Sequence, residues 1–133
     1  MNEEILNDET RRKLKDFSKT FLRLHKTLLD AAKIEYEAKN GAIKSVNQYF
    51  HLVLEDAHFA WLRKISSLIA LIDEAVSMRR PATQAEAESL LNEARILLYF
   101  ENADEEFNKK FQNALRTNPN AVVNYNETLN FVK

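Results

Sequence analysis

The sequence predicts a single all-α domain, a four-helix-type bundle whose second and fourth helical stretches are interrupted. Apolar residues recur at every third or fourth position, helix-capping residues separate these runs, and residues that favour tight turns are scarce. The 133 residues include one glycine, two prolines and no cysteine, whereas β folds need many glycines and prolines in their turns. A chain of this length forms one domain, and we expect residues 1–7 to be a loose extension at its N-terminus.

The longest predicted helix runs from about Asn7 to Asn40. Its apolar side chains form one stripe, because three- and four-residue steps return to the same side of a helix. Asn40 precedes the only glycine, Gly41, whose freedom to adopt positive φ favours a helix end there. At 1.5 Å per residue this helix is about 45–50 Å long. The stripe consists of Leu14, Phe17, Phe21, Leu24, Leu28 and Ala31.

The second helical stretch is predicted to break near Asp56. Ser45 with Gln48 indicates a capping box that opens it, and residues 78–81, Met-Arg-Arg-Pro, are expected to end it. Two apolar stripes follow one another, with centres that differ by roughly 70–80° around a helix. One straight helix cannot turn both toward one core, so Asp56 is expected to cap a second piece that begins at Ala57. The first stripe is Val46, Phe50, Val53, Leu54 and Ala57, and the second is Leu62, Ile65, Leu68, Ile69, Ile72 and Val76.

Three further helix starts are indicated in the second half of the chain. Thr83 with Glu86 and Asn102 with Glu105 have the capping-box spacing. Pro119 favours a helix start, because proline lacks a backbone N–H and the N–H of the first helical residue has no partner within the helix. The positions predicted to face the core are Ala87, Leu90, Leu91, Ala94, Leu97, Leu98, Phe107, Phe111, Leu115, Val122, Val123, Leu129 and Val132.

The segment from Asp56 to Glu74 reads D-A-H-F-A-W-L-R-K-I-S-S-L-I-A-L-I-D-E. It resembles a family of uncharacterised bacterial all-helical proteins with the pattern D-(P)-x-F-A-W-L-R-x-x-S-x-L-I-x-x-I-D-E, although Ala57 stands in place of the proline. The likeness extends from about Phe17 to the C-terminus. It implies a compact helical protein, and it implies no activity because the family has none assigned.

The charge balance disfavours nucleic-acid partners, and the lack of cysteine is compatible with the bacterial cytoplasm that the resemblance implies. Nineteen basic and twenty acidic residues give a net charge of −1, so no overall field attracts nucleic acid or an anionic membrane. The N-terminal residues lack the pattern of a secretory signal. The longest uncharged run of the most apolar helix, residues 65–72, is far shorter than the ~20 apolar residues that span a bilayer. We therefore expect no membrane insertion.

The histidines suggest an alternative function, a haem- or metal-binding bundle that uses His25, His51, Glu55 or His58. Glu55 and His58 have the spacing found in di-iron carboxylate bundles, and His25, His51 and Glu55 resemble part of a hemerythrin-like site. Both sets are incomplete because no histidine follows His58. We therefore expect the histidines to be structural or solvated, and we predict no cofactor and no metal site.

A basic stripe lies about 180° from the apolar stripe of the first predicted helix. Asp16 and Asp30 interrupt it. It is either an ordinary solvated helix face, a docking face for an acidic protein partner, or a face that pairs with the excess of acidic residues after position 81. The stripe consists of Arg12, Lys15, Lys19, Arg23 and Lys26, which form the predicted docking face, and Lys33.

No catalytic group has the partners that a reaction needs. Ser66 and Asp73 lie seven residues apart with Arg63 nearby, but a nucleophilic serine also needs an imidazole base and an oxyanion donor. We interpret Ser66 as an edge hydroxyl and Asp73 as part of an interhelical ion pair. The protein is therefore predicted not to be an enzyme.

The leading prediction is a non-catalytic helical interaction protein that self-associates as a homodimer. A first helix near 45 Å packed by later helices near 25 Å leaves about one-third of its length unburied, and a second copy would bury the surplus of apolar stripe. Storage of a small ligand in a cavity of the bundle is a further alternative.

Overall fold

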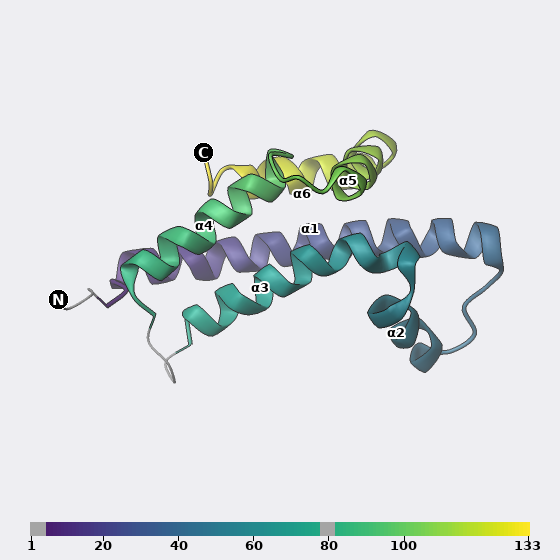
Figure 1. Ribbon diagram of the computed structural model, residues 1–133, viewed down its shortest axis with the longest axis horizontal. Coiled ribbons are helices and arrows are strands. Elements are labelled where there is room, and N and C mark those ends of the chain that lie inside the picture. The colour runs from purple at the N-terminus through teal and green to yellow at the C-terminus, as the bar shows by residue number, and fades with distance from the viewer. Residues whose placement is uncertain (1–4, 78–81) are drawn as a thin grey trace.

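α-Helices form almost all of the ordered secondary structure, as predicted. A computed structural model describes residues 5–77 and 82–133 (Figure 1). The predicted helix end at residues 78–81 lies outside the described residues. The elements are α1 (Asp8–Asn40), α2 (Val46–Glu55), the 3₁₀-helix η1 (Ala57–Leu62), α3 (Arg63–Ala75), α4 (Gln84–Leu98), α5 (Glu105–Thr117) and α6 (Pro119–Leu129).

The 33-residue helix α1 runs the length of the molecule, and α3 and α6 lie along it (Figure 1). It begins after Asn7, whose side-chain Oδ1 accepts a hydrogen bond from the Thr10 N–H at 2.8 Å. It ends as predicted at Gly41, where φ is +85° and the N–H donates to the Glu37 carbonyl at 2.9 Å. The local capping groups therefore set both ends of the longest helix.

The apolar stripe of α1 is covered by the chain itself, with Ala32 buried and Ala31 half-buried. α3 and α6 make the most extensive contacts with α1, and η1, α4 and α5 cover other parts of it. The stripe itself therefore has no uncovered surplus, because several short helices follow one another along α1, and residues 33–40, the part of α1 beyond the stripe, are exposed or half-buried. The fully buried members of the stripe are Leu14, Phe17, Phe21, Leu24 and Leu28.

The predicted break at Asp56 is confirmed. The Asp56 backbone is extended, and its Oδ1 accepts a hydrogen bond from the His58 N–H at 2.8 Å, so it caps η1. The Arg63 guanidinium donates to the carbonyls of Leu54 and, at 3.4 Å, Val53. These carbonyls have no partner within a helix that ends here, so Arg63 satisfies the C-terminal end of α2 while Asp56 starts the next element.

The apolar stripe predicted for α2 does not face the core. Val46, Phe50, Leu54 and Ala57 are exposed, and Val53 is half-buried. The side chain of Tyr49 takes the inner side instead, with its ring centroid 6.2 Å from that of Phe59 and 4.9 Å from Lys33 Nζ. Both sides of α2 are apolar, and the side with the tyrosine packs against η1.

Helix starts in the second half follow the predictions with one correction. The hydroxyl of Thr83 accepts a hydrogen bond from the Glu86 N–H at 3.1 Å and caps α4. The predicted cap at Asn102 is wrong by two residues, because Asp104 accepts from the Phe107 N–H at 3.0 Å and caps α5. Asn102 instead accepts from the Asp104 N–H at 2.9 Å.

α6 buries small residues rather than the predicted valines. It begins at Pro119 as expected, but Val122 and Val123 are exposed while Ala121 and Thr128 are fully buried. After the helix, Val132 is buried as predicted. The side of α6 that faces α1 therefore has little room for large side chains.

An aromatic cluster centred on Phe111 joins η1, α5, α6 and the turn after α4. The ring centroid of Phe111 lies 5.2 Å from that of Phe100, 5.6 Å from Phe107, 5.8 Å from Tyr125 and 6.2 Å from Trp61. Aromatic contacts at these distances add to the stabilisation from apolar burial. The cluster therefore connects the C-terminal helices to η1.

The expectation of a loose extension over residues 1–7 is wrong for residues 5–7. Leu6 is only 3% exposed, and its N–H donates to the Ala82 carbonyl at 3.0 Å. Ile5 forms an isolated antiparallel bridge with Thr83. An apolar side chain that enters the core thus fixes this segment beside the start of α4.

Candidate functional site

An exposed apolar surface on α2, here called the α2 face, consists of Val46, Phe50 and Leu54. Their exposed fractions are 83%, 64% and 52%, and four-residue steps place the three side chains on one side of the helix. No residue of α2 is fully buried. The helix projects from the side of the molecule near the C-terminal end of α1 (Figure 1). Large apolar surfaces of this kind are typical of interaction sites.

Local contacts fix the orientation of the α2 face. The hydroxyl of Ser45 caps the helix by accepting from the Gln48 N–H at 3.0 Å, and Gln48 Oε1 accepts from the Lys44 N–H at 2.8 Å. At the other end Arg63 binds the last carbonyls, and on the inner side Tyr49 packs against Phe59. With both ends and the inner side held, the α2 face points away from the core.

Opposite charges lie at the two ends of the α2 face. Lys44 precedes the helix and Glu55 ends it. His51 lies beside the face, with its Nε2 3.1 Å from Glu55 Oε2. Both groups of this pair are exposed, so it contributes little to stability.

The four residues proposed for haem or metal binding do not share one site. His51 and Glu55 are exposed. His58 Nε2 lies 2.7 Å from the Ala32 carbonyl oxygen, which can only accept, so this nitrogen donates. The described part of the chain contains no group of three His, Cys, Asp or Glu side chains placed to hold a metal ion.

His25 is half-buried, and this burial makes the stability of the fold depend on pH. Desolvation lowers the pKa of His25 below its ordinary value of 6.5. The unfolded chain therefore binds this proton at a higher pH than the folded chain does. The contribution of His25 to stability is complete above about pH 6.5 and falls as the pH decreases through the lowered pKa.

We expect His25→Gln to flatten the dependence of the free energy of unfolding on pH between about 7 and 5. Urea denaturation followed by circular dichroism at a series of pH values measures this dependence. Leu22→Gln is the matched control, because it places glutamine at an exposed position of the same helix and removes no titratable group, and it should keep the wild-type slope. Equal slopes for wild type and His25→Gln would contradict the assignment.

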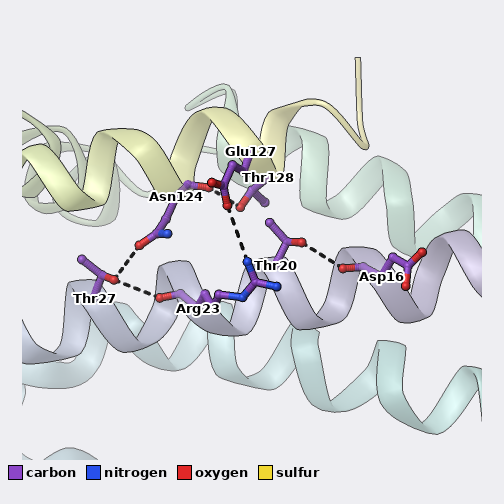
Figure 2. Close-up of polar contacts among 7 residues, drawn as sticks. All are labelled: Asp16, Thr20, Arg23, Thr27, Asn124, Glu127 and Thr128. Carbon is purple, nitrogen blue, oxygen red and sulfur yellow. Dashed lines mark hydrogen bonds and ion pairs between the residues drawn. The ribbon is translucent and has the colours of Figure 1, made fainter.

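All five residues of the predicted docking face, Arg12, Lys15, Lys19, Arg23 and Lys26, are exposed. Two of them pair within the chain. Arg23 Nη1 lies 3.7 Å from Glu127 Oε2 of α6, and Lys26 Nζ lies 3.6 Å from Asp30 Oδ2. Figure 2 shows Arg23 reaching across to Glu127, next to the 2.6 Å hydrogen bond between Thr27 and Asn124. The C-terminal part of the stripe thus contributes to the contact between α1 and α6.

The candidate serine site is not assembled. The hydroxyl of Ser66 donates to the Arg63 carbonyl at 3.3 Å within α3. Asp73 Oδ1 instead accepts a 2.5 Å hydrogen bond from the hydroxyl of Ser18 on α1. Asp73 therefore links two helices as expected, through its contact with the hydroxyl of Ser18.

No family model, no curated protein and no solved structure matches the chain. No helix within residues 5–77 and 82–133 combines the length and apolar character that a membrane crossing requires. The fold is all-α, and the α2 face is an outward apolar surface on one of its helices. Its membership of the bacterial family that it resembles stays a prediction.

Proposed function

We propose that the protein is a non-catalytic helical interaction protein that self-associates as a homodimer through the α2 face. The observation that supports this is the outward position of Val46, Phe50 and Leu54 on a helix whose other side is anchored. The sequence predicts a dimer because the apolar stripe of α1 is expected to stay partly uncovered. That stripe is covered by the chain itself, so it does not support the proposed dimer. The exposed apolar surface lies on α2 instead.

The spacing of the α2 face fits a second copy of the same helix. Val46 and Leu54 lie four residues to either side of Phe50. In an antiparallel pair around a two-fold axis at Phe50, the two phenylalanines meet, and Val46 of each copy meets Leu54 of the other. A two-fold interface needs this kind of self-complementary surface, and rows of side chains four apart are the ridges that commonly pack between helices.

The charges at the ends of α2 support the same arrangement. Lys44 and Glu55 lie at nearly equal distances in sequence from Phe50. Antiparallel pairing brings Lys44 of each copy close to Glu55 of the other, whereas parallel pairing would place like charges together. Charge complementarity at an interface sets orientation more than affinity. We therefore infer an antiparallel homodimer in the bacterial cytoplasm.

An acidic protein partner on the basic stripe has less support. Arg23 and Lys26 are paired within the chain, which leaves Arg12, Lys15 and Lys19 as the cations for such a contact. Beside Lys19 and Lys26 lies one strongly exposed leucine, Leu22, whereas the α2 face offers three apolar side chains in a row for the centre of an interface. We therefore place self-association first.

Sedimentation velocity over about 1–500 μM protein tests the dimer. Three apolar side chains cover less than the ~800 Å² per partner of a standard interface, so we expect weak association with a dissociation constant of micromolar or higher. Phe50→Ser with Leu54→Ser should be monomeric throughout this range. Leu22→Ser is the matched control because Leu22 on α1 is 54% exposed, much like Leu54 at 52%, and it should keep the wild-type association.

A charge exchange distinguishes a second copy from any other occupant. Lys44→Glu should weaken association, and adding Glu55→Lys should restore it, because the exchanged charges again face each other in an antiparallel pair. A wild-type protein that stays monomeric at the highest concentration overturns the proposal. So does a dimer that survives the Phe50 and Leu54 substitutions.

A further inference from the structure

A cleft lies beside the C-terminal third of α1, bordered by η1 and α5. Its volume is about 420 Å³, which is within the ~300–1,000 Å³ typical of small-molecule sites. Its walls come from residues far apart in the sequence, so it exists only in the folded chain. The α2 face does not line it, so a ligand in the cleft does not depend on self-association.

The inner part of the cleft is lined by apolar residues. Leu28 is fully buried at its base, and the buried alanines Ala32 and Ala114 leave room beside it. The indole of Trp61 forms part of the wall, and its orientation is set by Phe107 and Phe111, with ring centroids 6.1 and 6.2 Å away. Small residues next to an indole form a surface on which a planar ring can stack.

The rim of the cleft carries more positive than negative charge. Lys39 comes from the last turn of α1 and Lys110 from α5, against the single carboxylate of Glu35. Lys110 Nζ lies 3.2 Å from Glu106 Oε1 on its own helix, so Lys39 is the lysine better able to meet a ligand. His58 also lines the cleft, and its Nε2 is fixed by the Ala32 carbonyl.

We propose that this cleft binds a small aromatic anion. The planar ring lies against Trp61 and the alanines, and the anionic group lies at the rim beside Lys39. The ring excludes water from the apolar base, and the lysine sets the orientation of the ligand. This site is open to solvent at the rim, unlike a cavity enclosed within the bundle.

The fluorescent probe 8-anilinonaphthalene-1-sulfonate, a planar apolar sulfonate, tests the site directly. Trp61 is the only tryptophan, so its emission reports on the cleft. We expect saturable binding of one probe per chain, with Trp61 emission falling as probe emission rises by energy transfer. The absence of saturable binding, or binding without any change in Trp61 emission, overturns the proposal.

Substitutions at the cleft then locate the bound probe. Lys39→Glu should raise the dissociation constant about tenfold, because a cation near the sulfonate becomes an anion. Ala31→Phe should abolish binding by filling the cleft, with circular dichroism to check the fold. Lys15→Glu makes the same charge change on α1 outside the cleft and should bind like wild type. Equal losses in the two lysine variants would show a general charge effect and refute the site.

Because the probe also binds exposed apolar surfaces, Phe50→Ser is the control for the α2 face. It should leave probe binding unchanged. Binding that is lost in Phe50→Ser but kept in Lys39→Glu would place the probe on α2 and overturn the cleft assignment. Unchanged sedimentation of the Lys39→Glu variant would separate the loss of probe binding from any effect on self-association.

Discussion

Phe111→Ala is expected to lower the free energy of unfolding by about 3–5 kcal/mol. Phe111 is fully buried, and its ring contacts those of Phe100, Phe107, Tyr125 and Trp61. Removing it leaves a cavity where α5 meets η1 and α6, and it removes four aromatic contacts at once. Urea denaturation followed by circular dichroism measures the change.

The same substitution at Phe50 is the matched control. Phe50 is 64% exposed, so Phe50→Ala should change the free energy of unfolding by less than about 0.5 kcal/mol. Both variants are measured at low micromolar protein, where self-association does not contribute. A loss below about 1 kcal/mol for Phe111→Ala would mean that the cluster repacks around the gap.

Helix ends are predictable from the sequence because they depend on groups a few residues apart. Ser45, Asp56 and Thr83 each accept a hydrogen bond from a backbone N–H two or three residues later. The predicted start of α5 is two residues too early because two residues, Asn102 and Asp104, could each cap this helix. Asp104 is favoured by its contact with Lys64, whose Nζ lies 3.4 Å from Asp104 Oδ2, and residue spacing does not show this contact.

The pKa of Asp104 reflects the same choice. The Phe107 N–H and the neighbouring Lys64 ammonium stabilise its carboxylate and lower its pKa below the ordinary value of 3.8. A cap that accepts a backbone hydrogen bond as a charged group is stronger than a neutral one. Asp104 is therefore the better capping residue of the two.

The orientation of α2 cannot be predicted from periodicity. Its two sides are both apolar, one with Val46, Phe50 and Leu54 and the other with Tyr49, Leu52 and Val53. The pattern indicates a helix but not which side packs, and contact with η1 decides it. The candidate interaction site is therefore visible only in the structure, although its three residues belong to one stripe in the sequence.

The cleft beside α1 cannot be predicted either. Leu28, Trp61 and Lys110 line it together, yet they belong to α1, η1 and α5. Each of them fits an ordinary position in a predicted helix: a core leucine, a core aromatic and a surface lysine. Only the crossing of the three elements shows that they share one space.

Ala121→Leu is expected to lower the free energy of unfolding by about 1–3 kcal/mol. Ala121 is fully buried on α6, and the helical repeat places it on the same side as Asn124 and Thr128, which lie against α1 in Figure 2. One turn further along this contact, the hydroxyl of Thr27 donates to Asn124 Oδ1 at 2.6 Å, so the two helices are close together there. Adding a larger side chain here forces the two helices apart.

Val123→Leu is the control, because it places the same leucine on the same helix at an exposed position. It should change the free energy of unfolding by no more than about 0.5 kcal/mol. Because α6 makes the most extensive contact with α1, a displaced α6 should also lose the 3.7 Å pair between Arg23 and Glu127. Arg23→Ala should therefore destabilise the Ala121→Leu variant less than it destabilises wild type, and additive losses would show that the two helices stay in place.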